Sequence, residues 1–231
     1  SLKNMRYAFA YGADAVYAGQ PRYSLRVRNN EFSRERVLAQ GIAEAHALGK
    51  KFYLTANLMP HNSKVKTYIR DLEPVIALGP DALIMADPGL IMMVRERWPE
   101  LPIHLSVQAN TMNYASVQFW QRVGIKRIIL SRELSLDQVE EIRQACPDIE
   151  LEVFVHGALC IAYSGRCLLS GYFNHRDANQ GSCTNACRWD YKVKGARQDI
   201  SGDIHSADVY LIEEANRPGE LMPIEEDEQG T

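Results

Sequence analysis

Apolar residues along most of this chain alternate between two arrangements. One has the spacing of an amphipathic helix, and the other is a short, nearly continuous apolar run. Helical spacing is found at 2–11, 33–48, 64–78, 90–97, 114–123 and 136–145, and the apolar runs lie at 14–19, 52–57, 82–86, 103–107, 127–130 and 151–155. Short apolar strands separated by helices are typical of a parallel sheet covered by helices. The pattern therefore predicts an α/β fold with six parallel strands.

A (β/α)8 TIM-type barrel fits this pattern better than an open doubly wound sheet, because no glycine-rich dinucleotide-binding loop follows any of the runs. Six strands fall short of eight, and the chain opens on a helix with Ser1 instead of methionine. We therefore expect an incomplete barrel, with one strand missing before residue 1 and the closing strand lying beyond Thr231.

The pattern changes after the sixth run and predicts three regions. Residues 1–159 form the partial β/α barrel, 160–190 a cysteine-rich segment, and 191–231 an acidic region with an irregular loop and a β-hairpin. The loop is expected over 194–207, which is polar and shows no periodicity. The hairpin strands are expected at 210–214 and 220–224, on either side of the turn signal Asn216-Arg-Pro-Gly219.

Four of the five cysteines follow the last apolar run with the spacing C-x6-C-x15-C-x3-C: Cys160, Cys167, Cys183 and Cys187. Only the last pair comes near the spacing of about two to four residues that structural zinc sites favour. Iron–sulfur clusters also take four thiolates and tolerate irregular spacing, whereas two disulfides would require an oxidising compartment. Spacing alone leaves these three interpretations open. Cys146 is expected to be a small buried side chain.

Polar side chains follow the apolar runs, and in a barrel the residues after the strands converge on one mouth. Gln20, Asp87 and the candidate catalytic residues Asn57, Gln108, Asn110 and His156 lie at these positions, together with candidate substrate-binding residues Arg22, Arg26, Arg28, Arg132 and Glu133. Such an amide-rich set suits a small anionic or heterocyclic ligand. Simpler interpretations stay open: Asp87 could cap the next helix, and Arg132 with Glu133 could form a surface ion pair. His156 is close enough to Cys160 for a thiol–imidazole pair, unless Cys160 binds a metal.

Charge is unevenly distributed along the chain, whose net charge is −3. Residues 208–231 contain eight acidic residues and one base, so the remainder of the chain is positive. A positive body with local arginine groups suits a polyanionic partner, although an ordinary mixed surface has the same composition. No apolar run reaches the roughly 18 residues that a membrane-spanning helix needs.

The stretch from Glu152 to Ser170, EVFVHGALCIAYSGRCLLS, resembles the signature of peptidase family U32, the collagenase-like peptidases. The similarity extends to YGADAVY at 11–17, HLSVQAN at 104–110 and LSRELS at 130–135, and so covers nearly the whole chain. Peptidase machinery itself is hard to find, because the sequence has neither an H-E-x-x-H nor a G-x-S-x-G motif.

The resemblance implies more than the residues do. Within the family it is similar to a bacterial branch for which the peptidase name is historical and whose members support oxygen-independent hydroxylation, while related proteins hold a 4Fe-4S cluster on four cysteines spaced as here. It implies 5-hydroxylation of the wobble uridine of tRNA, forming 5-hydroxyuridine, with the hydroxyl group supplied through prephenate-dependent metabolism.

The expected ligands of the 4Fe-4S cluster are then the four clustered cysteines, with zinc as the alternative metal. The expected partners are tRNA, prephenate or a derivative of it, and an electron donor, in a cytoplasmic protein without a membrane span. A U32-type peptidase acting on collagen-like peptides is the alternative function, and a non-catalytic scaffold held by zinc is the third hypothesis.

Overall fold

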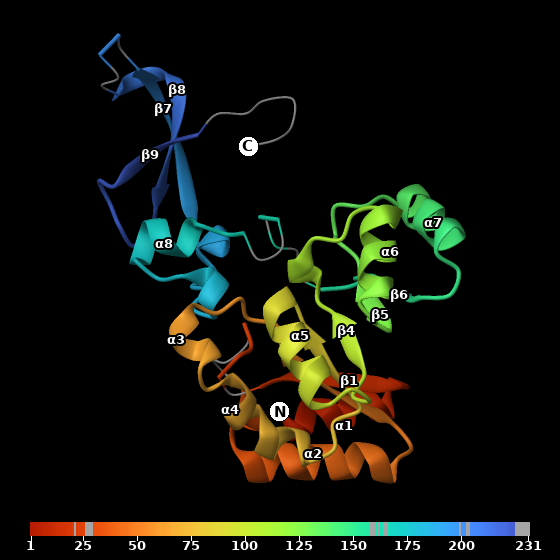
Figure 1. Cartoon of the computed structure of the whole chain (residues 1–231). Coiled ribbons are helices and arrows are strands. Elements are labelled where there is room, and N and C mark those ends of the chain that lie inside the picture. The colour runs from red at the N-terminus through yellow and green to blue at the C-terminus, as the bar shows by residue number, and fades with distance from the viewer. Residues whose placement is uncertain are drawn as a thin grey trace. The chain divides into compact units, whose positions relative to one another are not determined.

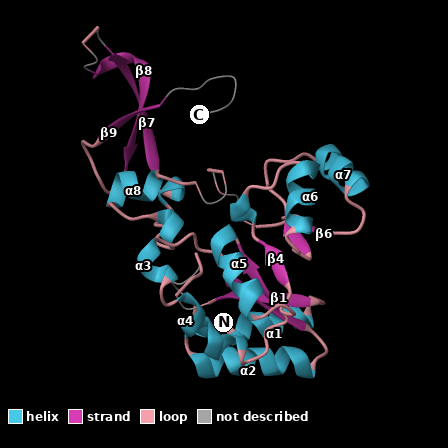
Figure 2. Ribbon diagram, in the orientation of Figure 1, coloured by secondary structure: helices cyan, strands magenta, loops and turns pink. Residues whose placement is uncertain are grey.

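Six parallel strands form one sheet in the computed structural model of the chain, in the order β1-β2-β3-β4-β5-β6. Their bounds are β1 Ala15–Gly19, β2 Lys51–Ala56, β3 Ala82–Met85, β4 Ile103–Leu105, β5 Arg127–Ile129 and β6 Glu150–Glu152. Helices alternate with the strands, so each crossover returns the chain to pair in parallel with the strand before it. The expected parallel α/β sheet is confirmed, and it has the form of a half-barrel (Figures 1 and 2).

The helices are α1 Leu2–Ala10, α2 Glu35–Ala47, α3 Asn62–Val65, α4 Tyr68–Ile76, α5 Pro88–Arg97, α6 Tyr114–Arg122 and α7 Leu136–Ala145. They bury one face of the sheet in a single large core that includes Phe52, Leu54 and Leu105. Alternate strand residues, such as Tyr53, Ile84 and Ile129, form a smaller cluster on the opposite, inner face. Because side chains alternate across a strand, the inner face is the one that a barrel encloses.

Two elements differ from the sequence-based expectation. The helix expected over 64–78 is two helices, because a turn at Lys66 and Thr67 separates α3 from α4. The hydroxyl of Thr67 in this turn lies 3.0 Å from the phenol of Tyr23. The last strand is shorter than expected: β6 ends at Glu152, and the side chains of Phe154 and Val155 are 48% and 90% exposed. Among the described strands β6 pairs only with β5, so the apolar run lacks a second neighbour to extend it.

The structure describes residues 1–20, 22–25, 30–157, 160, 162–163, 166–198, 200–201 and 204–224. The chain divides into two compact units, Ser1–Thr184 and Asn185–Thr231. The first unit contains the parallel sheet, its helices and the short helix α8, Leu169–Asn174. No helix in these residues combines the length and the apolar character needed to cross a membrane.

The second unit contains an antiparallel sheet of β7 Tyr191–Gln198, β8 Ile204–Glu214 and β9 Leu221–Ile224. The expected hairpin is confirmed by the pairing of β8 with β9. The irregular loop expected over 194–207 is wrong, because β7 pairs with β8 across most of that stretch. Its side chains are polar, but antiparallel pairing satisfies the backbone groups of both strands whatever the side chains are.

Candidate functional site at the carboxyl end of the sheet

Inner-face side chains become polar toward the carboxyl ends of the strands. The hydroxyl of Thr55 donates to the carbonyl of Ala18 at 3.2 Å and lies 2.8 Å from the hydroxyl of Ser24 in the loop after β1. Gly19 makes this close approach possible, because a Cβ there would lie only 2.8 Å from Ser24 Oγ. The loop after β1 is therefore fixed directly against β2.

Asn57 and Gln108, two of the candidate catalytic residues, are joined in a chain of hydrogen bonds. The backbone N–H of Leu25 donates to Asn57 Oδ1 at 3.2 Å, which leaves Asn57 Nδ2 to donate to Gln108 Oε1 at 2.9 Å. The hydroxyl of Ser106 also donates to Gln108 Oε1. Because two donors fix its oxygen, Gln108 must present its Nε2 group elsewhere, and no described residue accepts from it. Gln108 Nε2 is thus an oriented donor available to a ligand.

Two buried hydroxyls also follow strands of the sheet at this end. Asn110 adopts the left-handed conformation, with φ 50° and ψ 53°, and donates to the carbonyl of Gln108 at 3.1 Å. The next residue, Thr111, accepts a backbone hydrogen bond from Ser131 N at 3.2 Å. The hydroxyls of Thr111 and Ser131 are both buried and have no hydrogen-bond partner among the described residues. Buried polar groups are usually paired, so these two hydroxyls, which follow β4 and β5, mark a polar place at the carboxyl end of the sheet.

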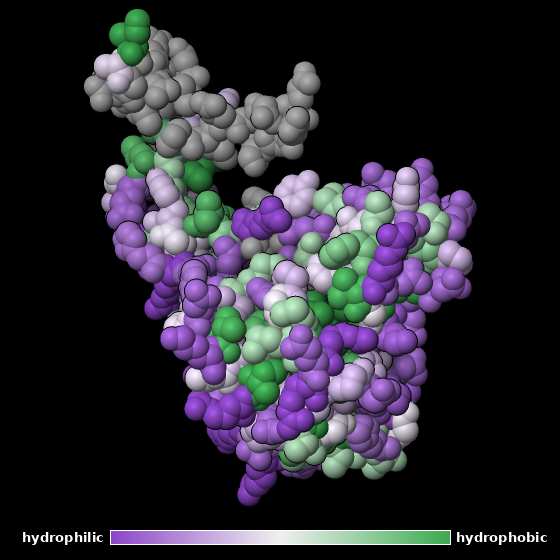
Figure 3. Space-filling model, in the orientation of Figure 1, coloured by the Kyte–Doolittle hydropathy of each residue, from purple (hydrophilic) through white to green (hydrophobic). Residues whose placement is uncertain are grey.

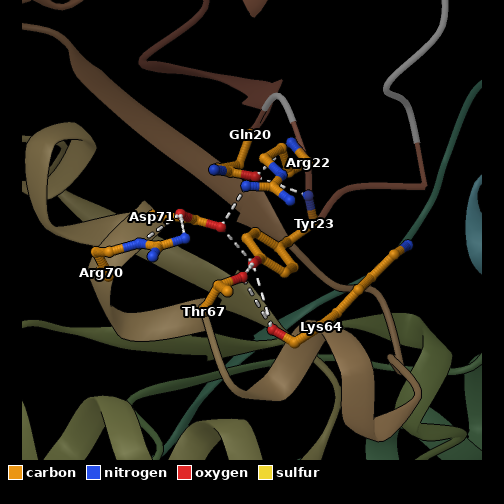
Figure 4. Close-up of polar contacts among 7 residues, drawn as sticks. All are labelled: Gln20, Arg22, Tyr23, Lys64, Thr67, Arg70 and Asp71. Atoms are coloured by element: carbon orange, nitrogen blue, oxygen red, sulfur yellow. Dashed lines mark hydrogen bonds and ion pairs between the residues drawn. The ribbon is translucent and has the colours of Figure 1, made fainter.

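Arg22 is held by a compact group of polar contacts (Figure 4). Gln20 Oε1 accepts from the backbone N–H groups of Arg22 and Tyr23, at 2.7 Å each, and so shapes the loop after β1. Asp71 on α4 accepts from Arg22 at 2.5 Å and from the phenol of Tyr23 at 2.9 Å. On its other side Asp71 accepts from Arg70 at 3.3 Å. Two guanidinium groups therefore share one carboxylate.

Burial and hydrogen bonding act in opposite directions on this carboxylate. Burial works to raise the pKa of Asp71, but hydrogen bonds from Thr67, Tyr23 and Arg70 and the charge of Arg22 outweigh it and lower the pKa. Burial raises the pKa of Tyr23, whose side chain is completely enclosed and meets Tyr68 edge to face at 4.7 Å. Asp71 is thus charged and Tyr23 a neutral donor at neutral pH.

The other predicted site residues do not belong to the group of polar contacts around Asp71. Asp87 caps α5 by accepting from Leu90 N at 2.9 Å, so the simpler interpretation of Asp87 is confirmed. The guanidinium of Arg132 lies 5.4 Å from the ring centre of Phe154. Glu133 and His156 are exposed, and the structure records no hydrogen bond between His156 and a described residue. Arg26 and Arg28 lie outside the described residues.

The part of the cysteine-rich segment that belongs to the first unit docks on the carboxyl end of the sheet. Gln180 Nε2 donates to the carbonyl of Met59, in the loop after β2, at 2.5 Å. A Cβ on the buried Gly181 would lie 3.2 Å from the carbonyl of Ser24 and 3.9 Å from Leu58. Gly181 also has φ +85°, which glycine adopts without strain. Residues 180–181 therefore sit directly on the loops after β1 and β2.

Within this segment, hydrogen bonds hold the backbone of Cys167 and of Thr184, which follows Cys183. Asn179 accepts from Cys167 N at 3.1 Å and donates to the carbonyl of Cys167 at 3.2 Å. Ser170 Oγ accepts from Thr184 N, the residue after Cys183, at 3.0 Å. Since Asn179 precedes Gln180, Cys167 is tied by its backbone to the part that docks on the sheet.

Within the described residues of the first unit, Cys160, Cys167 and Cys183 do not form a ligand set. Cys160, Cys167 and Cys187 are partly buried and Cys183 is exposed. Their chemistry suits an iron–sulfur cluster, but among the described residues no three His, Cys, Asp or Glu side chains form a group that could hold a metal ion. Cys187 also belongs to the second unit. Cys146 is 3% exposed and outside this segment, which confirms the expectation for it.

Nearer the amino ends of the strands the inner face carries a second polar group. Arg127 donates to Glu150 at 2.7 Å, and its guanidinium lies 5.4 Å from the ring centre of Tyr53. Tyr53 in turn meets the imidazole of His104 edge to face at 4.6 Å. Burial, together with the charge of Arg127, lowers the pKa of His104 to about 4. His104 is therefore neutral at physiological pH.

Sequence reasoning missed the hydroxyls at the strand ends and the Tyr23–Asp71 contact. A signal for the hydroxyls was present, because Tyr53, Thr55 and Asn57 alternate with apolar residues, as do His104, Ser106 and Gln108. That alternation marks one polar face of a strand. Asp71 had no such signal, since nothing in α4 indicates which loop its carboxylate meets.

Comparison with known proteins places the chain among U32 proteins. The family model described as peptidase family U32 matches residues 1–231. The tRNA hydroxylation protein P of Escherichia coli strain K12 is 64% identical and is matched over all of this chain and 55% of its own length. The 23S rRNA 5-hydroxycytidine C2501 synthase of the same strain is 36% identical, over 90% of this chain and 30% of that protein.

A solved structure of the U32 peptidase Mk0906 resembles the fold, with a TM-score of 0.55 and 17% sequence identity, over 65% of this chain and 63% of that one. At that identity the likeness shows the fold alone. The chain spans about half the length of the tRNA hydroxylation protein that it matches.

Proposed function

The chain belongs to peptidase family U32, and we propose that it is the sheet-bearing part of an enzyme that hydroxylates tRNA. The observation that carries this proposal is the 64% identity to the Escherichia coli tRNA hydroxylation protein P, which extends over the whole chain. The more distant relative is named for making 5-hydroxycytidine in rRNA. Two relatives named for hydroxylating RNA support an RNA substrate.

We propose that the target is C5 of the wobble uridine, and that the amide pair orients the base. Uracil presents two carbonyl acceptors and one N–H donor, and an amide side chain offers the complementary groups. Gln108 Nε2 is oriented as a donor by Asn57 and Ser106. The buried hydroxyls of Thr111 and Ser131 lie at the same end of the sheet and are able both to donate and to accept.

The finer chemistry is also part of the proposal. Replacing C5–H by C5–OH is a two-electron oxidation of the uracil, and we propose that it proceeds without molecular oxygen. Prephenate or a derivative supplies the hydroxyl group and takes up the two electrons, so that R–OH becomes R–H. A separate electron donor is a further partner that would prime the protein and adds no net electrons to this exchange. We propose Cys160, Cys167, Cys183 and Cys187 as ligands of a 4Fe-4S cluster, with zinc as the alternative metal. The docking of Gln180 and Gly181 beside Asn57 supports a position for the cysteine-rich segment near the substrate.

Nucleoside mass spectrometry of tRNA tests this function. A strain lacking the gene should lose 5-hydroxyuridine and its derivatives from the wobble position, and the intact gene should restore them. Unchanged wobble uridines in the deletion strain would reject the proposal. Cleavage of a collagen-like peptide by the purified protein, with the tRNA of the deletion strain unchanged, would instead support the peptidase implied by the family name.

A further inference from the structure

Four basic side chains border the candidate site on one side: Arg22 in the loop after β1, Lys64 in α3, Lys66 just after it, and Arg70 in α4. The loop after β1 is joined to the loop that leads from β2 into α3, because Leu58 N donates to the carbonyl of Tyr23 at 2.9 Å. We call these four residues the basic surface. The face seen in Figure 3 is largely hydrophilic over α3 and α4.

The charges of the basic surface are only partly neutralised. Asp71 is the single acidic residue in the stretches 20–25 and 57–72. Its side chain is 12% exposed, whereas those of Arg22 and Arg70 are 59% and 74% exposed. Lys64 and Lys66 form no ion pair with a described residue, and Lys66 is exposed. Four cations and one enclosed carboxylate leave a net positive charge facing solvent.

The carboxylate of Asp71 positions the two arginine side chains of the basic surface. Arg22 and Arg70 reach Asp71 from opposite sides, and the ammonium group of Lys64 points away from it (Figure 4). Tyr23, completely buried, holds Asp71 in place through its phenol. Each guanidinium has five N–H donors and uses one or two of them on Asp71, so the others are available to a ligand.

The basic surface adjoins the place where substrate is expected. Asn57 begins the loop that leads into α3, and its Oδ1 accepts from Leu25, three residues beyond Arg22. Met59, which receives the hydrogen bond from Gln180, lies between Asn57 and Lys64. A strand of nucleic acid whose base reaches Gln108 would therefore pass these cations with its neighbouring phosphates.

We propose that the basic surface binds the sugar–phosphate backbone of the RNA substrate beside the nucleotide at the carboxyl end of the sheet. This inference rests on the proposed function for its substrate. Arg22, Lys66 and Arg70 are exposed and Lys64 is half-buried. The four cations are spread from the loop after β1 to α4, which fits a series of phosphates better than one small anion, because small ligands are bound in enclosed pockets.

Salt dependence of tRNA binding tests the proposal. The probe is an unmodified tRNA transcript, and the test variant is Lys64→Gln/Lys66→Gln/Arg70→Gln. Each lost phosphate contact lowers the slope of log K against log salt by about 0.7–0.9, so three losses should lower it by about 2. The control Lys51→Gln/Arg122→Gln/Lys126→Gln removes the same charge near the amino ends of β2 and β5 and should leave the slope unchanged.

The single variant Lys66→Glu guards against misfolding of the triple variant, because Lys66 is exposed and outside any helix. It should lower the slope by about one unit or more. If the slope is unchanged in both test variants, or falls equally in the control, the basic surface does not bind the RNA backbone. That conclusion holds even if nucleoside analysis confirms tRNA hydroxylation. A lowered slope in a protein whose deletion leaves wobble uridine unchanged supports the surface and rejects the function. Absence of tRNA binding by the wild-type chain rejects the surface directly.

Discussion

Tyr23 and Asp71 are 48 residues apart in the sequence, yet the phenol of Tyr23 donates a hydrogen bond of 2.9 Å to Asp71 Oδ2. The contact joins the loop after β1 to α4 and fixes the carboxylate that Arg22 and Arg70 share. One buried side chain thereby determines how two exposed cations are presented at the edge of the candidate site.

The first prediction concerns this contact. Tyr23→Phe keeps the buried ring but removes the donor to Asp71, so the free energy of unfolding should fall by about 2 kcal/mol, the usual worth of a hydrogen bond to a charged group. Urea unfolding followed by circular dichroism measures the change. Tyr11→Phe is the control, because Tyr11 is 89% exposed. Equal stability of Tyr23→Phe and wild type would contradict the role given to the phenol.

The second prediction concerns pH and His104. The folded protein holds its pKa at about 4, against an ordinary 6.5, so the unfolded chain binds the proton first as pH falls. The free energy of unfolding should therefore decrease as pH falls from 6.5 to about 4. Since a shift of one pKa unit corresponds to roughly 1.4 kcal/mol, the total decrease should be about 3 kcal/mol.

Replacement of the imidazole isolates this effect. His104→Phe should lose that part of the pH dependence, because its side chain does not titrate, whereas the exposed His175→Phe should keep it. Unfolding curves recorded across the window decide the question. A wild-type profile parallel to that of His104→Phe would show that His104 does not contribute.

The third prediction concerns the metal. Alanine at Cys160, Cys167, Cys183 or Cys187 should abolish iron incorporation in anaerobically purified full-length protein, together with its visible absorbance, because a 4Fe-4S cluster uses four thiolates. Cys146→Ala should retain the iron, since Cys146 is buried in the core of the first unit, away from the segment. Metal analysis that finds stoichiometric zinc in place of iron would favour the alternative cofactor.

The fourth prediction concerns base recognition. Gln108→Glu keeps the shape of the side chain but replaces the oriented Nε2 donor with a carboxylate oxygen, which repels a uracil carbonyl. Wobble hydroxylation in a complemented deletion strain should fall at least tenfold, as expected for a loss of about 1.4 kcal/mol or more. Iron content should remain that of wild type, because Gln108 is not a proposed ligand.

A matched substitution controls for charge in this experiment. Gln121→Glu adds the same negative charge on α6, away from the strand ends, and should leave hydroxylation intact. Normal hydroxylation by Gln108→Glu would mean that the base binds elsewhere.

The sequence alone determined the alternation of helices and strands in the first unit, because a helix and a buried strand each leave a local periodicity of apolar residues. It also placed Asn57, Gln108 and Asn110 at strand ends, and such ends meet at one edge of any parallel sheet. It predicted the β8–β9 hairpin from its turn residues.

Tertiary structure alone decided which side chains meet. The Asn57–Gln108 hydrogen bond, the shared carboxylate of Asp71 and the docking of Gln180 on Met59 all join residues far apart in the sequence. Strand β7 likewise formed from a polar stretch because β8 was available to pair with it. Local periodicity reports which face of an element is buried, but it carries no information about the path of a loop, and loop paths bring these partners together.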